Sequence, residues 1–263
     1  MSKVISQPNK QPMFSPEHGV YVVLFGSFLS GTALAQHWTL ATTLAFCAAF
    51  LGFQAEYPWE MQVKQRKSLK PRFLFWGSLY SLGAAGIALW LYFQAPVLLW
   101  IYLGAIAALI IDLTETWFKA RKSIANELVT FAAVCLCAPF AYAATTGTLS
   151  LTAMGLWLLN TCYFSSSIFS VKLRKPKTNA LLPGILYHAI AAVIVTGLYL
   201  LGGLSLATAL AFSLALLKFG LIAGRKEWYC NAPIQTVAIL ETSFALGFIA
   251  IVALSVLPAH LPV

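Results

Sequence analysis

Charged residues are scarce in this sequence: Asp, Glu, Lys and Arg make up 10% of its 263 residues, against about 25% in an ordinary soluble domain. Hydrophobic residues make up 60%, and the mean hydropathy is +0.80. This composition, with its long uncharged runs, is typical of integral membrane proteins and excludes an ordinary soluble domain. The net charge of +9 is then no sign of nucleic-acid binding, because excess Lys and Arg in membrane proteins mark cytoplasmic loops.

Motifs that would identify a reaction are also missing. The five cysteines follow no metal-binding or disulfide spacing, and those in apolar runs behave as small hydrophobic residues. The sequence has no nucleophile elbow, Walker loop, zinc motif, haem-attachment pair or dinucleotide-binding glycine pattern. The polar residues 1–18 contain three prolines and no short apolar core, so we expect no cleavable signal peptide.

Apolar runs long enough to cross a bilayer, which takes about 20 residues, recur along the chain. We expect an all-α, polytopic transmembrane bundle of about nine helices, a multi-pass protein of a bacterial inner membrane or its equivalent. It would consist of a cytoplasmic N-terminal segment, residues 1–18, and one transmembrane domain, residues 19–258. The expected spans are residues 19–36, 39–56, 73–94, 97–117, 124–145, 150–172, 182–202, 204–223 and 235–257.

The distribution of basic residues predicts the orientation. If the N-terminus is cytoplasmic, all 17 Lys and Arg residues lie in the cytoplasmic segments or, for Lys172 and Lys218, at the inner ends of helices. The turns on the other side contain none, as the positive-inside rule requires. The C-terminus would then be outside. These outer turns are too short for an external domain, so we expect any site to open toward the cytoplasm.

The segment before the first expected helix contains Glu17 and His18. One interpretation is a plain helix start, with Ser15 as the cap, Pro16 in the first turn and an acid favoured by the helix dipole. The other is a carboxylate–imidazole pair at the cytoplasmic mouth of a site.

Two pairs of acids are candidates for binding a divalent cation such as Mg²⁺. Glu56 and Glu60 share a helix face only if the helix continues through Pro58, which proline disfavours. They could hold a Mg²⁺–diphosphate ion pair or lie in a solvated loop. Asp112 and Glu115 are three residues apart on the fourth expected helix, where they form either a functional pair or a polar packing seam.

The sixth expected helix has a polar face, because its polar residues recur at intervals of three and four. Such a face could bind a ligand with a polar head, or it could join helices by hydrogen bonds. The residues that we expect to hold a substrate are Arg121, Lys122, Asn160, Ser167, Lys172 and Arg174.

Three residues are candidates for acid–base chemistry: Glu127, His188 and Glu241. Glu127 lies one turn into a helix, where the dipole also favours it for structural reasons. Glu241 is the acid hardest to explain as a surface group, because a buried carboxylate needs a partner or a proton. His188, Arg174 and Lys218 are its possible partners.

Several short motifs resemble the YwiC-like family of bacterial integral membrane proteins. The resemblance covers most of the chain and departs at Val20 and Tyr21, where Ala-Trp would be expected. It implies a membrane location but no particular activity. The motifs are PEHG at 16–19, the basic segment after the second helix, NEL at 126–128, SVKLRK at 170–175, Tyr187-His188, and Pro233 with Glu241.

The expected architecture is similar to that of UbiA-type intramembrane prenyltransferases. That resemblance implies an isoprenyl diphosphate held through Mg²⁺ by two Asp-rich motifs, after the second and sixth helices. This sequence has only Glu56 and Glu60 at the first position and no acid at the second. Lys172, Arg174 and Lys175 at the second position suit direct phosphate binding instead.

Three functional hypotheses follow. The first is a UbiA-like intramembrane enzyme with prenyltransferase-like chemistry, or a binding protein for an isoprenoid or anionic lipid, with a cytoplasm-facing site. The second is a proton-coupled transporter of a small solute that uses Glu241 and His188. The third is a non-catalytic membrane assembly factor, in which the polar faces only join helices.

Overall fold

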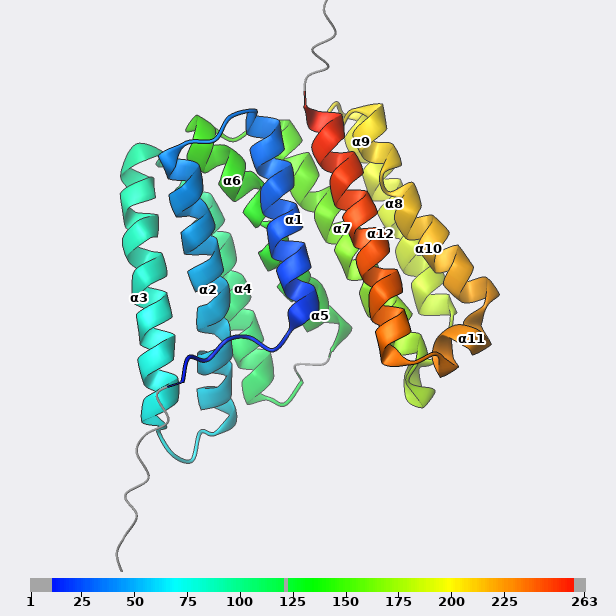
Figure 1. Ribbon diagram of the computed structural model, residues 1–263, viewed down its shortest axis with the longest axis horizontal. Helices are drawn as coiled ribbons and strands as arrows, with labels where there is room; N and C mark the ends of the chain where they lie inside the picture. The colour runs from blue at the N-terminus through cyan, green and yellow to red at the C-terminus, as the bar shows by residue number, and fades with distance from the viewer. Residues whose placement is uncertain (1–10, 121–122, 258–263) are drawn as a thin grey trace, which may run out of the picture.

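The computed structural model describes residues 11–120 and 123–257, and its regular structure is entirely helical within those ranges. The long helices lie side by side in one bundle (Figure 1), which confirms the all-α membrane fold. The helices are α1 (His18–Ala35), α2 (Leu40–Lys64), α3 (Pro71–Gln94), α4 (Leu98–Trp117), α5 (Ile124–Cys135), α6 (Cys137–Thr146), α7 (Leu151–Leu173), the 3₁₀ turn η1 (Pro176–Thr178), α8 (Leu182–Leu200), α9 (Leu206–Leu210), α10 (Ser213–Gly224), α11 (Lys226–Asn231) and α12 (Ile234–Val256).

Seven helical segments in the described ranges are long and apolar enough to cross a membrane. They are α1, α3, α4, α5 joined to α6, α8, α9 joined to α10, and α12. The other two long helices, α2 and α7, have 25 and 23 residues, and they carry several of the polar residues discussed above, among them Glu56, Glu60, Asn160, Ser167 and Lys172. They have the length of a span, so the expected total of nine stays a prediction that depends on these two.

Local sequence explains where several helices begin and where one is interrupted. The hydroxyls of Thr39, Ser123, Ser150 and Ser205 each accept a hydrogen bond from the backbone N–H three residues later, which caps α2, α5, α7 and α9. The segment 124–146 is divided at Leu136. Pro139 accounts for the division, because proline offers no N–H to the carbonyl four residues earlier and its ring clashes with it.

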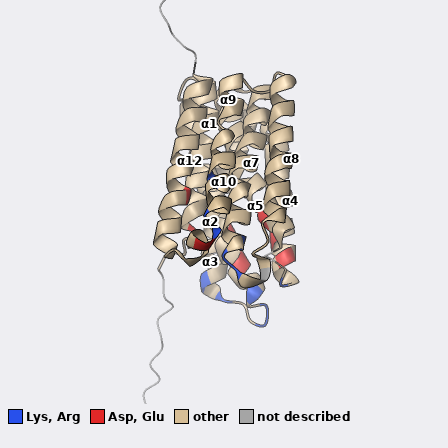
Figure 2. Ribbon diagram, turned by 90° about the vertical axis from the view of Figure 1, so that its right-hand side faces the viewer, with Lys and Arg blue, Asp and Glu red and all other residues tan. Residues whose placement is uncertain are grey.

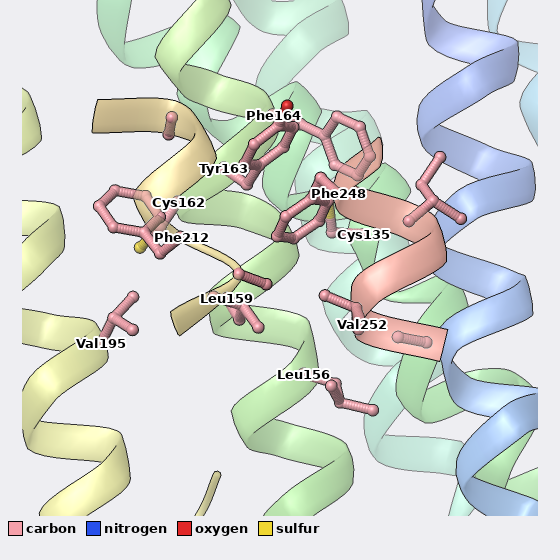
Figure 3. Packing of buried hydrophobic residues seen from close by; sticks show 14 of the residues in the cluster. Cys135, Leu156, Leu159, Cys162, Tyr163, Phe164, Val195, Phe212, Phe248 and Val252 are labelled. Atoms are coloured by element: carbon pink, nitrogen blue, oxygen red, sulfur yellow. The ribbon is translucent and has the colours of Figure 1, made fainter. Parts of the chain in front are cut away.

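The interior consists of apolar clusters that meet along α1 and α7. In the cluster around α7, Tyr163 and Phe248 of α12 stack with their ring centroids 3.7 Å apart, and Phe164 packs edge-on against Phe248 (Figure 3). Glycines let the helices approach: the side chain of Ile249 fills the position next to Gly26, and the Ala138 carbonyl lies against Gly31. Large apolar side chains are exposed along α3, α4, α8 and α12, as expected of helices that face lipid.

The charged residues gather toward one end of the bundle (Figure 2). This charged end contains the C-termini of α2, α4 and α7 and the N-termini of α3, α5 and α8. It is the end that the sequence assigns to the cytoplasm. Since the structure contains no membrane, the orientation itself stays a prediction.

Candidate functional site

A cavity of about 380 Å³ lies among α2, α3, α4, α5 and α6. We call it the apolar cavity, because its walls are mostly alanine and other apolar side chains. Alanines 84, 85 and 88 of α3 and alanines 105 and 108 of α4 line it. Two carboxylates, Glu56 and Asp112, also line it, toward the charged end.

A second cavity of about 320 Å³ lies between α1, α5 and α7 at the charged end. We call it the polar pocket. It adjoins the apolar cavity, because Thr130 and Val134 of α5 line both. Its polar lining residues are Glu17, Asn126, Glu127, Thr130, Ser167, Lys172 and Lys175.

An ion pair joins two walls of the polar pocket. The Nζ atom of Lys172 lies 2.9 Å from Oε2 of Glu127, and their side chains are 12% and 29% exposed. Glu127 is in the first turn of α5 and Lys172 in the last turn of α7. The two helix dipoles therefore favour the negative charge of Glu127 and the positive charge of Lys172.

Hydrogen bonds fix α4 and α5 beside the two cavities. The Asn126 side chain donates from Nδ2 to Oδ1 of Asp112 at 2.7 Å, and both residues are buried. Ser123 caps α5 through the Asn126 N–H and donates to Glu115 at 3.4 Å. Asp112 and Glu115 thus each contact α5 and its cap, which is the packing role expected as an alternative to metal binding.

The four acids expected to bind Mg²⁺ do not all converge. Glu60 is buried and lies 2.5 Å from Lys64, and Glu115 contacts the cap of α5. Glu56 and Asp112 both line the apolar cavity. Within residues 11–120 and 123–257, no three His, Cys, Asp or Glu side chains are placed to hold a metal ion. Binding of Mg²⁺ by one or two of these carboxylates together with a substrate phosphate stays a prediction.

The expected substrate-binding residues are divided. Ser167 and Lys172 line the polar pocket, but Asn160 is buried and donates to Ser30 Oγ at 3.0 Å, which joins α7 to α1. Arg174 donates to the carbonyls of Tyr229 and Ala232 at 2.8 and 2.6 Å, so it holds the end of α11. Arg121 and Lys122 lie outside the described residues. At the mouth, Glu17 lines the polar pocket, whereas His18, the first residue of α1, is not among its lining residues.

A second group of charges lies in the other half of the bundle. Glu241 of α12 accepts from Nζ of Lys218 of α10 at 2.7 Å and from the Tyr229 hydroxyl of α11 at 3.4 Å. The side chain of Lys218 is only 2% exposed, so it lies inside the bundle. Burial, and then the negative charge of Glu241, raise the pKa of Tyr229 above its ordinary value, so its hydroxyl keeps the proton that it donates.

His188 is not the partner of Glu241. Its Nδ1 is 2.7 Å from the Gly184 carbonyl, which makes Nδ1 the protonated nitrogen, and its ring stacks on Phe219. The three acid–base candidates are thus not assembled: Glu127 is in the polar pocket, Glu241 is paired with Lys218, and His188 binds its own helix. Lys218 was one of three possible partners of Glu241, and a lysine within an apolar run is itself a signal of a buried charge.

The part of the chain that surrounds the apolar cavity and one side of the polar pocket matches a known protein family. Residues 14–142 match the model of the YwiC-like protein family, which confirms the resemblance over those residues. The matched region includes every helix that lines the apolar cavity, together with the Glu17 and Glu127 side of the polar pocket. No curated protein matches the chain.

Proposed function

For a multi-pass membrane protein whose residues 14–142 belong to the YwiC-like family, we propose that the paired cavities bind one lipid-like molecule. Its apolar chain, isoprenoid or acyl, occupies the apolar cavity. Its head, which carries an anionic group, occupies the polar pocket. The observation that carries this proposal is the junction at Thr130 and Val134, where the apolar cavity meets the polar pocket and its lysines.

The apolar cavity suits a chain that arrives from the bilayer. Its volume of about 380 Å³ is within the range of about 300–1,000 Å³ of ordinary ligand pockets. Ala85 of α3 and Ala105 and Ile106 of α4 line the cavity and are also exposed. The cavity therefore reaches the surface between α3 and α4, which is an apolar surface suited to contact with lipid.

The polar pocket suits an anionic head. Lys172 and Lys175 line it, and an ammonium group attracts a phosphate as a point charge with several donors. No metal ion is needed for this contact. We therefore propose binding of such a lipid and assign no transfer reaction to the site.

Filling the apolar cavity should abolish the binding. Ala84→Leu places a larger side chain in the space of the ligand chain, at a typical overpacking cost of about 1–3 kcal/mol, so we expect affinity to fall at least about tenfold. The probes are labelled isoprenyl diphosphate and labelled lysophosphatidylglycerol, bound to the purified protein in detergent. Lys172→Ala should also weaken the binding of both probes.

The matched control for this experiment is Ala250→Leu, the same substitution at an exposed position of α12. It should leave the affinity unchanged. If neither probe binds to the unmodified protein, or if Ala250→Leu weakens binding as much as Ala84→Leu, the proposed site is wrong.

A second candidate function, proton-coupled transport, is favoured by the buried charges around Lys218. Among the buried polar atoms that lack a hydrogen-bond partner within the described residues, four bear on this candidate. Three are on the α7 face that also bears Arg174. Unpaired polar groups are costly in an apolar interior, which favours water and a path for protons at this place. The atoms are Tyr163 OH, Ser166 Oγ, Ser170 Oγ and His188 Nε2.

This second candidate predicts proton uptake into proteoliposomes that contain a pH-sensitive dye. Glu241→Gln should abolish the uptake. The double variant Lys218→Met/Glu241→Gln leaves no charge unpaired, so it controls for folding and should be equally inactive. Uptake that persists in the double variant, or is absent from the unmodified protein, would exclude the pair from proton transport.

A further inference from the structure

The polar pocket contains two charges of each sign. Glu17 lies at the N-cap of α1 and Glu127 in the first turn of α5, while Lys172 and Lys175 lie at and just beyond the end of α7. The four side chains surround one space of about 320 Å³. The pocket is therefore not simply basic, although its lysines were the reason for proposing an anionic head.

The ion pair in the pocket makes a purely anionic head a poor match. Lys172 and Glu127 are already in contact at 2.9 Å and are largely shielded from water. An anion that takes over Lys172 separates it from Glu127, and a partly buried carboxylate without its partner is destabilised. A head that also bears a cation avoids this cost. Its anion contacts Lys172, and its cation takes the place of the Lys172 ammonium beside Glu127.

The apolar cavity determines the orientation of such a molecule in the polar pocket. Its charged lining residues are the acids Glu56 and Asp112, and Asp112 is already hydrogen-bonded to Asn126. A phosphate cannot be stabilised there, whereas the lysines lie on the opposite wall of the polar pocket, at and just beyond the end of α7. The phosphate is thus directed toward α7 and a cation toward the acids of α1 and α5.

Building on the proposed function, we propose that the polar pocket recognises a zwitterionic head, a phosphate together with an ammonium group. Lys172 and Lys175 hold the phosphate. Glu127 and Glu17 hold the ammonium. The pair Lys172–Glu127 opens on binding, and each partner receives an opposite charge from the ligand.

The test compares two lipids that share one acyl chain, lysophosphatidylethanolamine and lysophosphatidylglycerol, on the full-length protein in detergent. The first has phosphate and ammonium, and the second has phosphate without the ammonium. We expect the first to bind about tenfold more tightly, a difference of 1.4 kcal/mol. Glu127→Gln should remove this preference by weakening the first and strengthening the second.

Two further variants keep the test decisive. Glu17→Gln should reduce the preference in the same direction, so the result does not depend on the folding of the Glu127 variant alone. Glu227→Gln, at an exposed position of α11 outside the pocket, should leave it unchanged. Equal or tighter binding of lysophosphatidylglycerol, still lost in Lys172→Ala, would overturn the zwitterionic head while the lipid site stands. Absence of binding of both lipids would overturn the lipid site as well.

Discussion

Replacing Lys218 alone by methionine is expected to lower the stability of the folded protein by about 3–5 kcal/mol, the usual loss when one partner of a buried ion pair is removed. Lys218 is 2% exposed, and its Nζ lies 2.7 Å from the Glu241 carboxylate. The Tyr229 hydroxyl, at 3.4 Å, is too distant to replace it. Methionine leaves the carboxylate of Glu241 in a largely apolar setting without its cation.

The double variant Lys218→Met/Glu241→Leu should be much more stable than either single variant, because two apolar side chains replace both charges. Thermal unfolding in detergent, monitored by circular dichroism, measures the stability of the double variant and of the two single variants. Lys67→Met, in the exposed connection between α2 and α3, should have almost no effect. If the single and double variants lose stability equally, Lys218 and Glu241 are not energetically coupled.

The membrane class and the gathering of charges at one end could be predicted from the sequence, because both depend on one-dimensional patterns. Hydropathy identifies the spans by length, and charge is excluded from the hydrocarbon. The polar helices α2 and α7 are identified less clearly as membrane spans by these patterns. Their hydropathy is reduced by residues such as Glu56 and Asn160, which other helices satisfy or enclose.

Two prolines show that a local rule needs the tertiary context. Pro139 coincides with the division between α5 and α6, but α2 continues through Pro58 to Lys64. The helix thus extends beyond residue 56, where we expected the membrane span to end, and the end of the span itself stays a prediction. Beyond Pro58, Trp59 packs on Gly77 and donates to Ser81 Oγ at 3.0 Å. These contacts with α3 hold a turn that proline alone would disfavour.

The choice of partners could not be predicted from the sequence. The acid Glu241 had three plausible partners, and periodicity cannot decide among residues on different helices. The packing of α10 against α12 decides for Lys218. Arg174 was assigned to a ligand because it ends a polar face, but the short helix α11, in a segment expected to be a loop, offers it two carbonyls. Residues that satisfy polar groups and residues that bind ligands look alike in a sequence.

Gly31→Ala is expected to destabilise the protein by about 1–3 kcal/mol, the usual cost of overpacking. A Cβ atom at Gly31 would lie 2.0 Å from the Ala138 carbonyl oxygen and 2.7 Å from its carbon. Both atoms belong to the backbone of α6, which cannot move aside as a side chain can. The added methyl group must therefore separate α1 from α6, a contact of small residues typical of membrane helices.

Helix propensity predicts the opposite sign, since alanine is favoured over glycine within a helix by about 1 kcal/mol. Gly86→Ala in α3 isolates that effect, because no atom lies within 4 Å of the added Cβ, and we expect it to be neutral or slightly stabilising. The comparison of their thermal unfolding in detergent thus separates the packing of α1 on α6 from propensity. If Gly31→Ala were as stable as Gly86→Ala, α1 and α6 would not be in close contact at Gly31 and Ala138.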